Sequence, residues 1–158
     1  YNNHMNLAYY ILIFDKGAEK ILSKFQMGED SAKATKRSTM VVETSTTYQK
    51  EVKEGDEVNV FLAHLDHDNK RLHYKLKMYD KTKNILSATT EVLALYMDLN
   101  KRKVSEFENE KIKIIDNFIE QNKCDFDTEG LKLSSKLKKW KLNLNYLVLL
   151  EILVIKIT

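Results

Sequence analysis

The polar residues Asn3, His4 and Asn6 stand directly before a strongly apolar segment with helical spacing. The first backbone N–H groups of a helix have no partner within it, and the helix dipole adds partial positive charge at the same end. Such donors polarise a carbonyl group and stabilise the oxyanion that forms when a thioester is attacked. The pattern therefore indicates acyl transfer. On residue types alone, asparagines that cap a helix and a surface location for His4 explain the same pattern more simply.

The segment that must position these residues runs from 6 to 27 and predicts a helix. Apolar residues recur in it at spacings of three and four, at Leu7, Tyr10, Ile11, Phe14, Ala18, Ile21, Leu22 and Phe25. This wide stripe indicates a helix that is more deeply buried than a surface helix. Gly28 suits its carboxyl end.

Four strands are predicted after a polar connection at 29–37. They cover 40–52, 58–65, 72–79 and 85–99, and the third alternates apolar and polar residues. Their short connections favour an antiparallel meander. Because a helix with so wide an apolar stripe needs a sheet that curls around it, the expected fold class is α+β.

A second helix and a tail of different character are predicted beyond the sheet. Residues 105–108 have the spacing of a capping box, which predicts a helix from there to about Asn122. We therefore divide the chain into a domain at 1–122 and a tail at 123–158. The apolar run at 146–155 follows a lysine-rich stretch and is shorter than the roughly 20 residues that a membrane span needs. Three interpretations stay open: docking on a membrane surface, pairing with another subunit, and a segment that is not native coding sequence.

Two motifs resemble a known family of enzymes. Residues 1–10, YNNHMNLAYY, followed by Phe14 and Asp15, resemble the signature of the 4-hydroxybenzoyl-CoA thioesterase-like hotdog proteins. Residues 70–73, KRLH, are similar to the betainyl-CoA thioesterase branch of that family. The resemblance covers residues 1–120 and implies a hotdog fold, in which an antiparallel sheet wraps a long central helix. It also implies hydrolysis of a small acyl-CoA thioester, betainyl-CoA of carnitine degradation in that branch, without a cofactor or metal.

The resemblance further implies roles for individual residues. Candidates for orienting the thioester or the attacking water are Asn3, His4 and Asn6, and candidates for substrate binding are Asp15, Glu43, Tyr48 and His73. Lys70 and Arg71 are the candidates for pairing with the phosphates of CoA. A quaternary ammonium such as that of betaine favours aromatic faces and a nearby carboxylate. Packing, capping or a solvated surface is the structural alternative for each of these side chains.

Two departures from the family pattern bear on activity. The family's aspartate, which serves as nucleophile or general base, and its first strand would both lie before Tyr1, and Asn3 replaces the usual glycine. We therefore expect a thioesterase of the hotdog fold whose first strand is missing here: either the natural protein is longer, or the piece given cannot catalyse by itself. The alternative to an enzyme is a non-catalytic hotdog subunit that binds acyl-CoA or has a structural role.

Composition limits the partners and the cellular compartment that we expect for the protein. The formal net charge of its 158 residues is +3, which is too small to indicate nucleic-acid binding. Cys124 is the single cysteine, which excludes an internal disulfide and fits a reducing compartment. We expect a cytoplasmic protein without a signal peptide. The family resemblance implies a homodimer or homotetramer in which active sites form between subunits.

Overall fold

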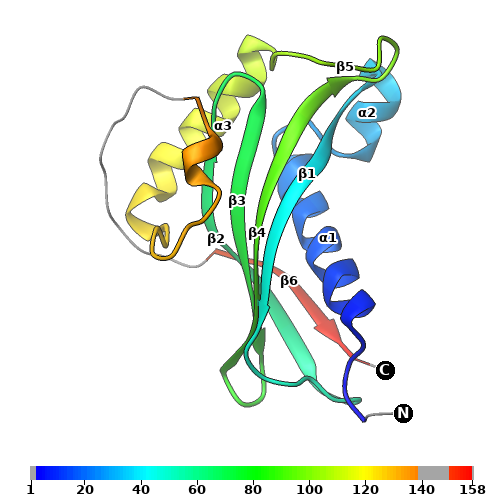
Figure 1. Ribbon diagram of the computed structural model, residues 1–158, viewed down its shortest axis with the longest axis vertical. Coiled ribbons are helices and arrows are strands. Elements are labelled where there is room, and N and C mark those ends of the chain that lie inside the picture. Colours follow the sequence, from blue (N-terminus) through cyan, green and yellow to red (C-terminus); the bar gives the residue numbers. More distant parts are fainter. Residues whose placement is uncertain (1–2, 139–149, 158) are drawn as a thin grey trace.

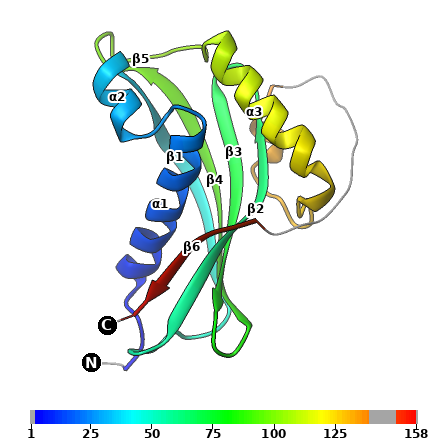
Figure 2. The same ribbon diagram turned by 180° about the vertical axis from the view of Figure 1, so that it is seen from behind.

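A computed structural model describes residues 3–138 and 150–157, which form a curled antiparallel sheet with α1 and α3 on one face (Figures 1 and 2). The helices are α1 (Leu7–Lys24), α2 (Glu29–Thr35) and α3 (Asn109–Asn122), with short 3-10 turns η1 (Lys123–Asp125) and η2 (Ser134–Lys136). The strands are β1 (Arg37–Tyr48), β2 (Glu57–His67), β3 (Arg71–Asp80), β4 (Ile85–Asp98), β5 (Lys103–Val104) and β6 (Leu150–Lys156). Their order in the sheet is β1-β4-β3-β2-β6, and β5 pairs with β4.

The predicted central helix and four strands are confirmed, with shifted ends. β1 ends at Tyr48, so residues 49–52 belong to the loop before β2. The connection at 29–37, predicted without regular structure, contains α2. This short helix was missed although Glu29 and Asp30 lie in its first turn, where the helix dipole favours acidic side chains.

The capping box predicted at 105–108 is wrong, because Glu108 is engaged elsewhere. Its carboxylate accepts hydrogen bonds from Arg37, the Tyr96 hydroxyl and Lys111, over 2.9 to 3.0 Å. α3 therefore begins only after Glu108, which is its N-cap residue but makes no side-chain capping bond.

The hydrophobic core lies between α1 and the concave face of the sheet. α1 buries Tyr10, Ile13, Phe14, Ala18 and Ile21, and β3 contributes Leu72, Tyr74, Leu76 and Met78. The rings of Phe25 and Phe118 meet edge to face with centroids 5.3 Å apart, which joins the end of α1 to α3. The amino half of α1 is less covered than its stripe predicts, because Leu7 and Tyr9 are 59% and 60% exposed.

Residues 126–138, called the outer-face segment below, cross the opposite face of the sheet. Asp127 of this segment pairs with two lysines of β3, Lys75 at 2.8 Å and Lys77 at 2.7 Å. Glu91 of β4 accepts hydrogen bonds from two backbone N–H groups of the segment. Burial raises the pKa of both carboxyl groups, but these bonds outweigh it, so that the pKa of Glu91 is lowered and that of Asp127 falls to about 2.

Strand β6 occupies the edge of the sheet beside β2, where the two backbones pair in antiparallel register. Ile155 and Ile157 pack against the core. The backbone N–H of Ile157 donates to the Asp56 carbonyl at 2.7 Å, and its carbonyl accepts from the N–H of Gly55 at 2.8 Å. The described end of the predicted tail is thus a strand of the same sheet, while 139–149 lie outside the described residues. Within the described ranges, none of the helices has the length and apolar character to cross a membrane.

His64 of β2 is buried under the outer-face segment. Neither of its ring nitrogens has a hydrogen-bond partner among the described residues, and its exposure is 7%. Its ring lies 5.0 Å from that of His73 and 5.7 Å from that of Phe126, measured between centroids. Burial, and after it the charge of His73, lowers the pKa of His64 to about 4.

This depressed pKa predicts a loss of stability on acidification. Because the unfolded chain binds a proton at His64 that the folded protein does not, the free energy of unfolding should fall as the pH drops from about 6.5 towards 4, by up to about 3 kcal/mol. Urea unfolding at successive pH values should show a shallower fall for His64→Phe. The exposed His4→Gln control should follow the wild type. Equal pH slopes for the wild type and His64→Phe would contradict this assignment.

Candidate active site

Asn6 caps the amino end of α1. Its side-chain oxygen accepts a hydrogen bond from the backbone N–H of Ala8 at 2.9 Å, and its carbonyl accepts one from Tyr9 at 3.0 Å. The N–H of Leu7, the first helical residue, has no acceptor within the helix by the geometry of a helix start. Among the residues that the structure describes it has no other acceptor either, so a free donor stands at the positive end of the α1 dipole.

The loop at 49–56 holds this helix start in place through Val52. The carbonyl of Val52 accepts a hydrogen bond from the N–H of Met5 at 2.7 Å, and its own N–H donates to the Tyr10 hydroxyl at 3.1 Å. Burial raises the pKa of the Tyr10 hydroxyl, which keeps it protonated at neutral pH. Met5, before the Asn6 cap, and Tyr10, in the first turns of α1, are thus both hydrogen-bonded to the buried loop residue Val52.

His4 has one ring nitrogen engaged and one available. Its Nδ1 lies 3.1 Å from the carbonyl oxygen of Met5. Because a carbonyl only accepts, the proton of the neutral imidazole is assigned to Nδ1, which leaves the lone pair of Nε2 for another donor. An exposed imidazole in this form can take a proton from water.

Asn3 has a left-handed backbone conformation, with φ of 55°. Glycine adopts this conformation without strain, and asparagine is among the few other residues that do so readily. Asparagine therefore tolerates the left-handed conformation at the position where the family pattern has glycine.

A cavity of about 390 Å³, called the tyrosine cavity, opens between the start of α1 and the end of β1. Its lining includes His4, Tyr10, Tyr48 and Glu51. The rings of Tyr10 and Tyr48 meet edge to face with centroids 5.1 Å apart. The Glu51 carboxylate pairs with Lys53 at 2.9 Å. The cavity thus offers aromatic surfaces and a carboxylate beside the helix start.

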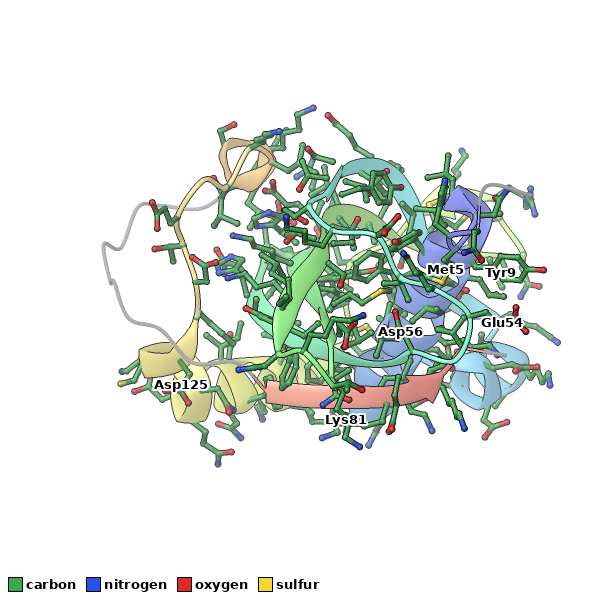
Figure 3. The ribbon with its side chains drawn as sticks, turned by 90° about the horizontal axis from the view of Figure 1, so that it is seen from below. Met5, Tyr9, Glu54, Asp56, Lys81 and Asp125 are labelled. Carbon is green, nitrogen blue, oxygen red and sulfur yellow. The ribbon has the colours of Figure 1, made fainter. Side chains whose placement is uncertain are left out.

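A second cavity, of about 700 Å³ and called the β6 cavity, also borders the residues before α1. Asn3, His4 and Asn6 line it, so the three residues predicted to be catalytic are brought together. Figure 3 looks onto this end of the molecule and places Met5 and Tyr9 on the same side as Glu54 of the loop. Among residues 3–138 and 150–157, there is no group of three or more His, Cys, Asp or Glu side chains that could hold a metal ion.

Glu43 and His73 lie on the outer face of the sheet, away from the start of α1. His73 is fully buried, with its Nε2 2.7 Å from the Glu91 carboxylate. Glu43 pairs with Lys136 of the outer-face segment. Because alternate residues of a strand point to opposite faces, neither reaches the helix start within one subunit. Their roles in substrate binding stay predictions, and the contacts of both support the outer-face segment.

Asp15 lies on the exposed part of α1, near the inner face of the sheet. Its partner in this region is Tyr74 of β3, whose hydroxyl has a raised pKa because of burial and, secondly, because of the negative charge of Asp15. Asp15 is therefore within electrostatic range of the concave face, and its role in substrate binding stays a prediction.

Lys70 and Arg71 lie at the turn between β2 and β3, at the opposite end of the sheet from the start of α1 (Figure 1). Arg71 pairs with Asp68 at 2.6 Å, and Lys70 pairs with Glu106 at 3.3 Å. Within one subunit the two cations are thus far from His4, and their predicted pairing with CoA phosphates is untested.

Three contributors to the site were missed in the sequence. Tyr10 was counted with the apolar stripe of the helix, although a tyrosine hydroxyl next to a helix start needs a partner when it is buried. Glu51 lies near the end of the strand predicted at 40–52, whereas in the structure it belongs to the loop after β1. The end of β6 adds Ile155 to the cavity lining, and no local pattern in the tail signals a pairing with so distant a strand.

Comparison with known proteins identifies the family. The sequence pattern of the thioesterase-like superfamily matches residues 1–124. The chain belongs to this superfamily. It is similar to the betainyl-CoA thioesterase of Pseudomonas aeruginosa strain PAO1, with 27% identity over 124 residues that cover 78% of each chain.

Solved structures of other proteins show the same fold. A protein from Staphylococcus aureus, solved in complex with CoA, has a TM-score of 0.70 and 22% identity, with 90% of this chain and 87% of that chain covered. A 1,4-dihydroxy-2-naphthoyl-CoA thioesterase from Synechocystis has a TM-score of 0.64 and 14% identity, with 73% and 85% covered. The predicted α+β hotdog fold is therefore confirmed.

Proposed function

We propose that this protein hydrolyses a small acyl-CoA thioester. The observation that carries the proposal is the start of α1, where Leu7 lines the tyrosine cavity and His4 lines both cavities. Among the described residues, neither the N–H of Leu7 nor Nε2 of His4 has a hydrogen-bond partner. Membership of the thioesterase-like superfamily supports the same reaction, as does the similarity to a betainyl-CoA thioesterase.

The reaction proposed for this site begins with the attack of water on the thioester carbonyl carbon, while Nε2 of His4 accepts a proton from that water. The carbonyl oxygen becomes an oxyanion, which the N–H of Leu7 and the positive end of the α1 dipole stabilise. The carbon–sulfur bond then breaks with its electron pair on sulfur. His4 returns its proton to the CoA thiolate, and the carboxylic acid is released.

The first test is release of free thiol from betainyl-CoA and short acyl-CoAs by the wild type and by His4→Ala. Because general-base catalysis contributes about 100-fold or more, kcat should fall by at least about that factor in the variant. Added imidazole should restore part of the lost rate, which a merely structural role of His4 does not predict. An active wild type with an unchanged kcat in His4→Ala would remove His4 from the mechanism.

We propose that the tyrosine cavity holds the acyl group. Its volume suits a small acyl chain, and Tyr10 and Tyr48 present aromatic surface beside the Glu51 carboxylate. A trimethylammonium group is attracted to aromatic faces and to negative charge. These features support betainyl-CoA as the substrate, with Tyr48 as a substrate-binding residue.

Substrate preference tests this assignment. The tert-butylacetyl group has the shape of the betainyl group without its charge, so the ratio of kcat/KM for the two CoA esters isolates the contribution of the cation. In Tyr48→Leu the preference for betainyl-CoA should drop about fivefold, as expected for one cation–π contact of about 1 kcal/mol. Tyr79→Leu is the control, because Tyr79 packs against Phe61 instead. An unchanged ratio in Tyr48→Leu would show that Tyr48 does not recognise the cation and would contradict the assignment of the tyrosine cavity.

A non-catalytic hotdog subunit is the second candidate function. The observation that favours it is the pairing of Glu51, the carboxylate that lines the tyrosine cavity, with Lys53. A subunit of this kind would bind acyl-CoA in the same two cavities without turnover. Binding of acyl-CoA with no release of thiol by the wild type would support this second function.

We propose in addition that the protein is a homodimer formed along β1. This strand lies at the edge of the sheet and exposes Met40, Val41 and Val42, of which Val41 is 54% exposed. On α1, Leu7 and Ile11 add further exposed apolar surface. Long apolar edge strands pair with other chains unless they are covered, so a second copy of β1 is the expected neighbour.

The assembly is tested by light scattering after size-exclusion chromatography. The wild type should elute with the mass of a dimer or tetramer, and Val41→Lys should shift towards the monomer because a lysine at the edge opposes strand pairing. Lys113→Glu on α3 is a control on another surface. A monomeric wild type would contradict the proposal.

A further inference from the structure

The imidazole of His64 lies between β2 and the outer-face segment without a polar partner. Both of its ring nitrogens are buried, and neither has a hydrogen-bond partner among the described residues. The neighbouring His73 is hydrogen-bonded to Glu91 through Nε2, while its Nδ1 is also buried and without a partner in the described part of the chain. A neutral imidazole is tolerated in such a place, whereas an imidazolium has two N–H donors that need acceptors or water.

The charged and titratable groups around His64 come from three strands and from the outer-face segment. They are Asp66 on β2, His73 and Lys75 on β3, Glu91 on β4 and Asp127 on the segment. Two of the carboxylates already hold the segment. Glu91 accepts a hydrogen bond from the N–H of Leu133 at 2.7 Å, and Asp127 pairs with a lysine of β3 at 2.8 Å. A proton on His64 could therefore draw on either carboxylate only at the expense of the bonds that attach the segment.

Phe126 covers His64 from the side of the segment. Its ring meets the imidazole edge to face with centroids 5.7 Å apart, and it is buried. The following residue, Asp127, donates its backbone N–H to the carbonyl of Ala63, next to His64 in β2, at 2.6 Å. Since the segment is not a strand of the sheet, contacts of this kind and not a backbone ladder hold it in place. Detachment of this short stretch therefore lets water reach His64.

We infer that the outer-face segment is an acid-sensitive cover of the sheet: a proton on His64 favours an open state in which residues 126–138 leave the outer face, while α1 and the strands keep their places. In the open state water supplies the partners that the imidazolium lacks in the closed one. Because burial lowers the pKa of His64 from 6.5 to about 4, closure is fully favoured above pH 6.5 and loses ground as the pH falls towards 4. The cover is independent of the proposed hydrolysis.

Amide hydrogen exchange at pH 7.5 and pH 5.0, corrected for the pH dependence of the chemical exchange rate, tests the inference on the full chain. In the wild type the protection of peptides from 126–138 should fall about 30-fold at pH 5.0, as follows from a pKa of His64 near 4 when closed and 6.5 when open. The pKa values of Glu91 and Asp127 are lowered, so both carboxylates stay ionised at pH 5.0 and do not cause the loss. The paired strands β3 and β4 should keep their protection.

Two variants assign the effect to His64 and its cover. His64→Phe keeps a ring beside Phe126 but binds no proton, so its segment should be equally protected at both pH values. In Phe126→Ala, water reaches the imidazole without detachment of the segment, so the pKa of His64, followed by NMR of its ring, should rise towards 6.5. This second variant removes a side chain of the segment and leaves the strands unchanged. The exposed His4→Gln control should respond to pH as the wild type does.

Four results would overturn the inference. The first is unchanged protection of the segment in the wild type at pH 5.0, and the second is an equal loss of protection in β3 and β4, which indicates unfolding of the whole domain. The third is a His64→Phe variant whose segment still loses protection in acid. The fourth is an unchanged pKa of His64 in Phe126→Ala, since that result shows that the segment does not keep water from the imidazole.

Discussion

The buried backbone of Val52 is the constraint on which the site depends. Its carbonyl and its N–H both bond to the region that opens α1, one to Met5 and the other to the Tyr10 hydroxyl. A helix start with free donors is useful for catalysis only when its position is fixed, because a displaced donor no longer meets the oxyanion. The loop supplies this fixation from outside the helix, and the Asn6 cap supplies it from within. The tyrosine cavity and the β6 cavity both border the residues that Val52 holds in place.

The two faces of the sheet have different roles because strand residues alternate. The concave face carries the apolar residues that pack on α1, while the outer face carries a polar layer in which Glu91 joins His73 to the backbone of the outer-face segment. Buried carboxylates of this kind are stable only when they are fully bonded. The polar layer therefore attaches the segment with directional bonds, and the proposed active site lies at the end of the concave side.

The sequence predicted well those features that depend on local pattern. The stripe of the first helix, the alternation of 72–79 and the polar residues before Leu7 each reflect a periodicity or a cap, which are properties of neighbouring residues. The capping box at 105–108 failed because the Glu108 side chain has distant partners. The candidate site was only partly predictable for the same reason. Asn3, His4 and Asn6 are neighbours in the chain, so their proximity follows from the sequence. The location of Glu43 and His73 depends on the register of the strands, which decides the face of the sheet to which each residue points.

The place of β6 has a consequence for how the protein matures during synthesis. Ile157, which borders the same cavity as His4, lies about 150 residues further along the chain. Contacts of such long range form late and slow the search for the native state. A ribosome-bound chain that has exposed α1 and the first four strands still lacks one wall of the β6 cavity. The β6 cavity should therefore be complete only once β6 has emerged and docked beside β2.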